Sequence, residues 1–242
     1  MSTIYQSSPA PGSTASFSNL PWGERLQQAG SSRHAAIREA FASEPFLLTS
    51  LMGPVDGPEW PSDPAWLALE VDGCGAILSD GLSDPWVEKD RLATGLGLEV
   101  MVRSPEIAPV EGELLTLADS WIFPMTAEIS HTLASYPRLC SRLLAGEPLS
   151  MRFNIEHIKD GRGLAGALLH QPRDLPGGVK RLPTAGGDVT LIVATLLTRE
   201  ELRWLGGRGE EGRRRLLESL YAGGVGSRSL AERDSVCLEE AA

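Results

Sequence analysis

The stretch ILSDGLSDPW, from Ile77 to Trp86, brings hydroxyls and carboxylates together in two Ser-Asp pairs around Gly81. A serine hydroxyl becomes a nucleophile when a histidine base and an acidic residue activate it. Carboxylates can instead ligate a cation. Asp side chains also close turns by accepting hydrogen bonds from nearby backbone amides. The stretch therefore has three interpretations: a catalytic corner, a metal loop or a rigid turn.

The serine-hydrolase interpretation requires a serine on a strained turn, a histidine base and an acidic residue that orients it. Ser79 and Ser83 lack the flanking glycines of a G-x-S-x-G motif, and no motif surrounds any histidine. The histidines are His34, His131, His157 and His170. A hydrolase centred on residues 79–84 stays open as an alternative, because distant residues can assemble in space. The sequence itself predicts no catalytic residues.

The metal interpretation has two candidate sets of ligands. Glu128 and His131 form one E-x-x-H motif on a predicted helix, whereas a di-iron bundle needs that motif twice together with further glutamates. Asp80, Asp84 and Asp90 do not have the spacing of an EF-hand loop. The glycine pairs farther along match no phosphate-binding motif. We therefore expect neither a metal nor a cofactor.

Turn structure is the use that these residues suit best. Asp80 and Asp84 can bond backbone amides, and Gly81 tolerates a positive φ. If the turn also belongs to a binding surface, its candidate residues are Asp80, Ser83, Asp84 and Trp86. Trp86 is the expected anchor, because an exposed tryptophan on a rigid loop concentrates binding energy.

Charge and composition narrow the classes of partner. The chain has 242 residues, and 32 acidic against 22 basic side chains give a formal net charge of -10. This balance disfavours nucleic-acid binding, which needs basic surface to displace counterions from phosphates. It would suit a basic protein partner, but many soluble proteins are acidic, so simple solubility is the favoured explanation of the charge. Nothing in the sequence indicates the oligomeric state.

Three features predict a cytoplasmic protein that does not enter a membrane. The cysteines Cys74, Cys140 and Cys237 lie far apart and form no CxxC pair, which fits a reducing compartment. The first residues lack the basic and apolar regions of a signal peptide. The longest apolar run, from Val189, is too short to cross a bilayer.

Residues 1–21 are rich in Ser, Pro, Thr and Ala, so we expect a disordered tail followed by one domain over residues 22–242. Ser31 or Ser32 can cap a helix that runs to about Ser43.

A β region follows this first helix. The segments 66–71 and 74–80 flank Asp72-Gly73, which is a strong hairpin signal. In the segment 95–105 apolar residues alternate with others, so we expect a half-buried strand with Glu99 facing away from the core.

From Asp119 the apolar period becomes helical. Asp119 or Ser120 is the expected N-cap of a helix with Ile122, Met125, Ile129 and Leu133 inward, and residues 138–146 extend or follow it.

The remaining segments complete a mixed pattern. We expect a strand from Leu149, a loop over residues 171–187 and a central strand over residues 188–197 covered on both faces. Thr198 opens a helix through a capping box, and another helix covers residues 210–222. Strands and helices do not alternate strictly. The expected fold is therefore α+β, a single domain with a mixed, mostly antiparallel sheet and helices packed on it.

The order of several segments resembles the suppressor of fused domain family, especially its short bacterial versions. The resemblance covers about residues 45–237 and rests on AILSDGLSDPW, GLGLEVMVRSP, SWIFPMTAEISHT, VTLIVATLLTREEL and LAERDSV. In that family a strand leads into a Gly-Leu-Ser/Thr turn and then into a G-x-G-x-E strand. A Trp-containing helix follows, and later an apolar strand that runs into a Thr/Pro-x-Glu-Leu helix.

The resemblance implies an α+β interaction domain without catalytic residues. The His-Trp-rich lead-in and the additional C-terminal part of animal members are absent, so binding of Gli-type transcription factors does not carry over. Short bacterial versions resemble immunity proteins, which bind and block a cognate toxin. We therefore expect a protein-binding domain that neutralises a bacterial toxin, with a general adaptor as the alternative.

Overall fold

The chain is described here from a computed structural model that covers residues 17–49, 60–86, 93–107, 114–155 and 165–237. Most of the predicted tail, residues 1–16, lies outside these ranges. Phe17 belongs to the described part, and only 4% of it is exposed. The packed part of the chain therefore begins before Pro21.

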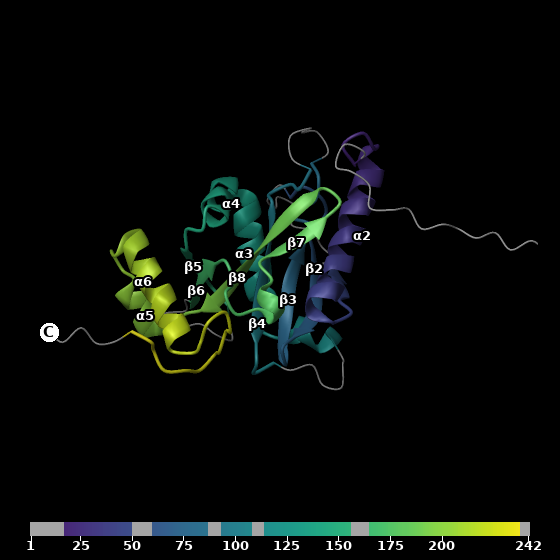
Figure 1. Ribbon diagram of the computed structural model, residues 1–242. Helices are drawn as coiled ribbons and strands as arrows, with labels where there is room; N and C mark the ends of the chain where they lie inside the picture. Colours follow the sequence, from purple (N-terminus) through teal and green to yellow (C-terminus); the bar gives the residue numbers. More distant parts are fainter. Residues whose placement is uncertain (1–16, 50–59, 87–92, 108–113, 156–164, 238–242) are drawn as a thin grey trace, which may run out of the picture.

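An eight-stranded sheet forms the centre of the molecule (Figure 1). Seven strands follow one another in the order β1-β2-β3-β4-β8-β6-β5, and β7 pairs with β8 beside this path. The strands are β1 Phe46–Thr49, β2 Ala65–Val71, β3 Cys74–Asp80, β4 Leu98–Ser104, β5 Leu149–Phe153, β6 Ala165–His170, β7 Arg181–Thr184 and β8 Gly187–Leu196. Only the β4–β8 pair is parallel among these strands. The predicted α+β class with a mostly antiparallel sheet is confirmed.

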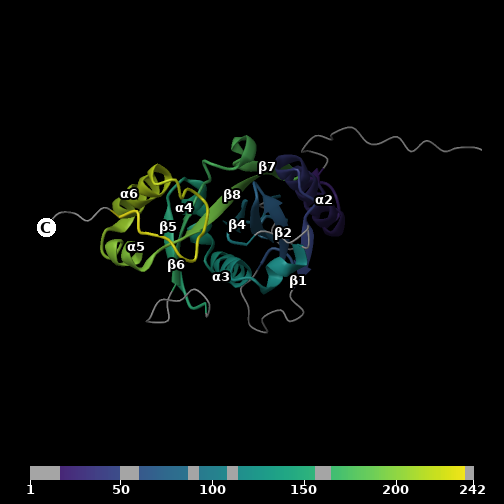
Figure 2. The same ribbon diagram turned by 90° about the horizontal axis from the view of Figure 1, so that it is seen from below.

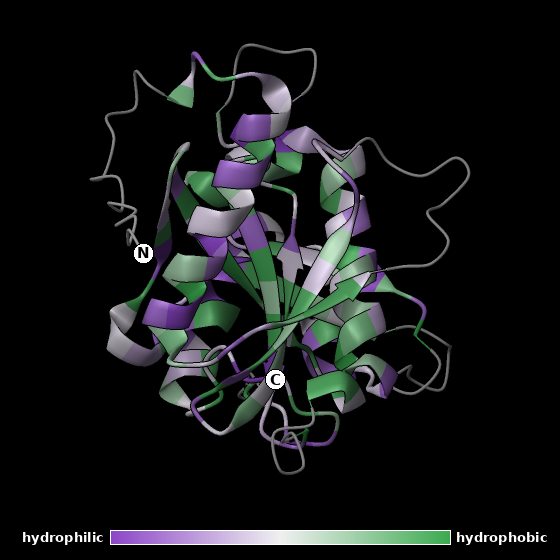
Figure 3. Ribbon diagram, turned by 90° about the vertical axis from the view of Figure 1, so that its right-hand side faces the viewer, coloured by the Kyte–Doolittle hydropathy of each residue, from purple (hydrophilic) through white to green (hydrophobic). Residues whose placement is uncertain are grey.

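Helices cover both faces and one end of this sheet. They are α2 Trp22–Phe41, α3 Ile122–Ser135, α4 Pro137–Leu144, α5 Arg199–Trp204 and α6 Gly209–Ala222, with short 3-10 helices η2 Leu114–Asp119 and η3 Pro176–Gly178. Figure 2 shows α2 and α3 on opposite sides of the central strands. The apolar stripe of α3 packs on one face, and Ile37 and Phe41 of α2 pack on the other. Figure 3 shows apolar residues concentrated along the strands between these helices.

The hairpin between β2 and β3 forms where the sequence predicts it. Asp72 and Gly73 have φ of 54° and 71°, and a two-residue type I′ turn needs positive φ at both positions. The strand over residues 187–196 is central, as predicted, and its last eight residues are buried. The capping box at Thr198 is also confirmed.

Three expectations about the elements are wrong. The first helix begins at Trp22, so Ser31 and Ser32 lie inside it and do not cap it. Its buried face includes the charged residue Arg33, which interrupts the apolar pattern by which the start of the helix could be recognised. The helix after Asp119 has no side-chain cap, because η2 occupies residues 114–119 and Ser120 donates to the Leu117 carbonyl instead. The expected loop over residues 171–187 contains η3 and β7.

The expectation that β4 is half-buried is also wrong. All seven of its residues are buried, because α2 covers the face opposite α3. Glu99 does alternate with Leu98 and Val100, yet it has no exposed surface. It points into the layer between the sheet and α2, where it meets Arg33.

Candidate functional site: a buried ion network beneath the 79–86 turn

Arg33 joins α2 to the turn that follows β3. Its Nε donates to Asp80 Oδ1 at 2.6 Å, and its Nη1 donates to Asp84 Oδ1 at 2.6 Å and to Ser83 Oγ at 3.1 Å. Only 3% of the Arg33 side chain is exposed, and 7% of each aspartate side chain. One guanidinium therefore holds both aspartates of the two Ser-Asp pairs in a nearly dry site.

Glu99 closes the same turn from the neighbouring strand. Its Oε1 accepts hydrogen bonds from the Gly81 and Ser83 backbone amides at 3.1 and 2.9 Å, and from Ser83 Oγ at 2.6 Å. Its Oε2 accepts from Ser79 Oγ at 2.5 Å. Within the described residues, the Gly81 and Ser83 amides bond Glu99, and the two aspartates bind Arg33, so the prediction that Asp80 and Asp84 bond these amides is wrong.

Burial and neighbouring groups shift the pKa values of Glu99 and Asp80 in opposite directions. Burial raises the pKa of Glu99 to about 7, against the opposite effect of the nearby Arg33. Burial also acts to raise the pKa of Asp80, but the hydrogen bond with His34 and the charge of Arg33 outweigh it and lower that pKa. His34 Nε2 lies 2.8 Å from Asp80 Oδ2 and is partly exposed. The positive charge of Arg33 compensates the negative charge of the buried carboxylates of Asp80 and Asp84, as a bound cation would.

Close backbone contacts make the turn rigid. Gly81 has a φ of 136°, a conformation that residues with a side chain rarely adopt. The Leu96 amide donates to the Leu82 carbonyl at 2.8 Å. Gly95 lies against the same turn, since a Cβ there would sit 2.3 Å from the Asp84 carbonyl oxygen. Asp84 also accepts a short hydrogen bond from Ser62.

The four predicted interaction residues differ in their exposure: three are buried, and Trp86 is partly exposed. Asp80, Ser83 and Asp84 are 6%, 2% and 5% exposed, so they act beneath the surface. Trp86 packs partly against the core and keeps part of its side chain exposed. Among the four residues, Trp86 offers the accessible surface.

The described histidines do not activate a serine of the turn. Ser83 Oγ donates to Glu99 and accepts from Arg33, while His34 bonds to Asp80. His131, from the E-x-x-H motif, packs edge-on against the rings of Trp60 and Trp66. In the part of the chain that the structure describes, no group of three His, Cys, Asp or Glu side chains is placed to hold a metal ion. His157 and Asp90 lie outside the described residues.

A second buried ion pair ties the chain's last described segment to the domain. Arg233 makes a bidentate pair with Glu201, with N–O distances of 2.6 and 2.7 Å, and Glu201 has no exposed surface. The Val236 amide also donates to Glu201 at 3.0 Å. This pair joins two of the segments that carry the family resemblance, TREEL and LAERDSV.

Sequence reasoning did not find Arg33, His34, Ser62 or Glu99 as members of the site. A signal for Arg33 does exist, since it lies four residues after Ala29 and four before Ile37 on the buried stripe of α2. A charged residue in such a stripe needs a buried partner of opposite charge. The acidic residues of the 79–86 turn are candidates for that partner, but distance along the chain hides the pairing.

Comparisons with known proteins bear on the fold. No family model matches the sequence, and no curated protein matches it. The chain is similar to a chain in the crystal structure of the Sufu–Fu complex, with a TM-score of 0.52 and 17% identity over 86% of this chain and 92% of that chain. It is also similar to Drosophila Suppressor of Fused, with a TM-score of 0.49 and 18% identity over 86% of this chain and 51% of that one. The chain thus spans about half of the Drosophila chain. The likeness to the chain in the Sufu–Fu structure shows that its fold is suppressor-of-fused-like.

Proposed function

We propose that this chain is a non-catalytic protein-binding domain. The observation that carries the proposal is the use of the turn's polar side chains. Asp80, Ser83 and Asp84 are buried and bound by Arg33, and Ser83 and its neighbouring amides bind Glu99. Side chains saturated in this way stabilise a turn and are not free to react. The similar fold in the Sufu–Fu structure supports a role in binding a protein.

We further propose that the partner is a basic bacterial toxin, which the chain neutralises by binding. The net charge of -10 supports this choice, because opposite charge on two proteins raises their association rate and favours correct pairing. The resemblance to short bacterial immunity proteins supports it independently. Binding would be anchored at Trp86, which stands on the turn made rigid by the ion network.

The proposal is tested by co-expressing the chain with the product of the gene immediately upstream of its own, which is where we expect a cognate toxin gene. Growth should recover when both are expressed, and the two purified proteins should form a stable complex by calorimetry. Trp86→Ala should weaken binding about 30-fold or more, the loss expected for a hot-spot residue. Tyr136→Ala is the matched control, because Tyr136 is 63% exposed and lies between α3 and α4.

Two outcomes would contradict the proposal. If the chain restores growth without forming a complex, it does not act by binding. If Trp86→Ala binds as tightly as the wild type while Tyr136→Ala does not, the anchor is assigned to the wrong surface. A stable complex with a different cellular protein and no effect on the toxin would instead identify the chain as an adaptor.

A further inference from the structure

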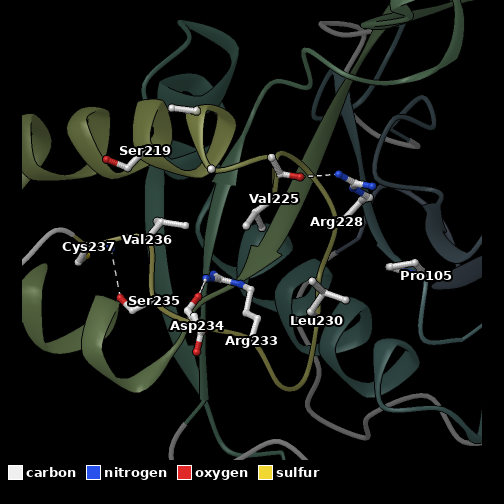
Figure 4. Close-up of a pocket in the computed structure, with 13 residues that line it drawn as sticks. Pro105, Ser219, Val225, Arg228, Leu230, Arg233, Asp234, Ser235, Val236 and Cys237 are labelled. Atoms are coloured by element: carbon white, nitrogen blue, oxygen red, sulfur yellow. Dashed lines mark hydrogen bonds between the residues drawn. The ribbon is translucent and has the colours of Figure 1, made fainter.

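A hollow of about 670 Å³ lies between the end of α6 and the segment that follows it. We call residues 225–237 the C-terminal strap. The strap belongs to no strand of the sheet, and it passes α6 and returns toward α5 (Figure 4). The residues that line the hollow include Ala222, Val225, Arg228, Leu230, Asp234 and Val236. Its volume falls within the range of sites that hold ligands of drug size.

The walls of the hollow are fixed by contacts with the rest of the domain. Ser229 Oγ donates to the Ala194 carbonyl and accepts from the Leu196 amide, both on β8. Arg233 is clamped by Glu201 of α5, and the Ser227 amide donates to Asp174 at 3.0 Å. A site whose walls are already ordered loses little conformational entropy when a ligand binds.

The lining combines apolar side chains with exposed charged side chains at two separate places. The apolar lining comes from Ala222, the last residue of α6, and from Val225, Leu230 and Val236 of the strap. Figure 4 shows Arg228 beside Val225, where it bonds to the Gly224 carbonyl, and Asp234 beside Arg233. Arg228 and Asp234 are both exposed. The lining therefore offers a positive charge at one place and a negative charge at another.

We propose that this hollow binds one extended peptide segment of a protein partner. An apolar side chain of the segment lies between α6 and the strap, an acidic side chain pairs with Arg228, and a basic side chain pairs with Asp234. These two charges carry this choice, because a segment with the complementary pattern satisfies both, and a purely apolar or uniformly charged ligand does not. The inference rests on the proposed protein-binding function and adds a second contact besides Trp86.

Selection of random phage-displayed peptides on the full chain tests the inference, followed by fluorescence anisotropy with the tightest peptide. The selected peptides should carry an apolar residue between an acidic and a basic one. Ala222→Trp should fill the hollow and weaken binding by about 10-fold or more. Ala145→Trp is the matched control, because Ala145 is likewise an exposed alanine at the end of a helix, α4. Arg228→Glu should shift selection toward peptides with a basic residue in place of the acidic one.

Other outcomes would overturn the inference and separate it from the proposed function. Failure to select any binding peptide, or binding that survives Ala222→Trp, excludes the hollow as the site. If the chain still neutralises the toxin in that case, the proposed function stands without the hollow. If the peptides bind as expected while no toxin is neutralised, the hollow stands and the toxin assignment fails.

Discussion

Replacing Arg33 by Met should remove much of the domain's stability. The substitution keeps a long side chain but leaves Asp80 and Asp84 without the guanidinium that both bind. All three side chains are more than nine-tenths buried, so water cannot reach the two carboxylates and stabilise them in place of the guanidinium. Breaking such a buried pair costs about 3–5 kcal/mol of unfolding free energy. For a chain of this size that loss lowers the melting temperature by about 6–20 °C.

Urea unfolding of wild type and variant measures this loss, and Arg38→Met provides the matched control on the same helix. Arg38 pairs with Glu44, but their side chains are 44% and 75% exposed, so this control should change stability by no more than about 0.5 kcal/mol. The loss in Arg33→Met should also shrink in acid. The lowered pKa of Asp80 means that its stabilising charge is present above about pH 4 and is lost as the pH falls further. A loss below about 1 kcal/mol, or one equal to that of the control, would refute the reasoning.

Three further substitutions probe the same architecture. Glu99→Gln should cost about 1–3 kcal/mol by urea unfolding, because both oxygens of a carboxyl group can accept hydrogen bonds whether or not it is protonated, whereas the amide nitrogen of Gln accepts none. Burial raises the pKa of Glu99 to about 7 in the folded protein, so the stability that this group gives the wild type is lost as the pH rises through 7. The cost of the substitution should therefore be larger at pH 4.5 than at about pH 8, and an equal cost at both pH values would contradict this prediction. Burial lowers the pKa of His170 to about 4, so the stability of the wild type should fall as the pH drops from 6.5 toward that value. Thermal melts of His170→Gln should show a weaker fall. An equal fall in both proteins would exclude His170 as the cause of the pH dependence. Gly95→Ala should lower the melting temperature more than Gly146→Ala, since both have positive φ but only the first would place a Cβ against the Asp84 carbonyl; equal effects would mean that the turn can yield.

Local patterns were sufficient to predict several elements. The Asp72-Gly73 turn, the nearly all-apolar strand over residues 188–197 and the capping box at Thr198 each depend on residues close in sequence. The α3 stripe was likewise predicted, and Ile122, Met125, Ile129 and Leu133 are all fully buried. Period and turn chemistry are local properties, so one sequence can reveal them.

The ion network could not be predicted in the same way, because its members come from distant segments. Arg33 and Asp80 are 47 residues apart, and Ser83 and Glu99 are 16 apart. The alternation in β4 indicated correctly that Glu99 and Leu98 face opposite sides. It could not indicate that α2 covers the second face, since that helix lies far upstream. The alternation of residues along β4 is therefore the same for a half-buried strand and for one whose second face is covered by a helix distant in sequence.

Titration of the partner toxin's activity with the purified chain tests the central claim most directly. A protein that acts by binding should abolish the activity at a fixed stoichiometric ratio. Ser83→Ala, assayed below its melting temperature, should inhibit at the same ratio, because Ser83 is buried and serves the turn. Inactivation of many toxin molecules by one molecule of the chain, lost in Ser83→Ala, would show catalysis at the 79–84 turn and contradict the account.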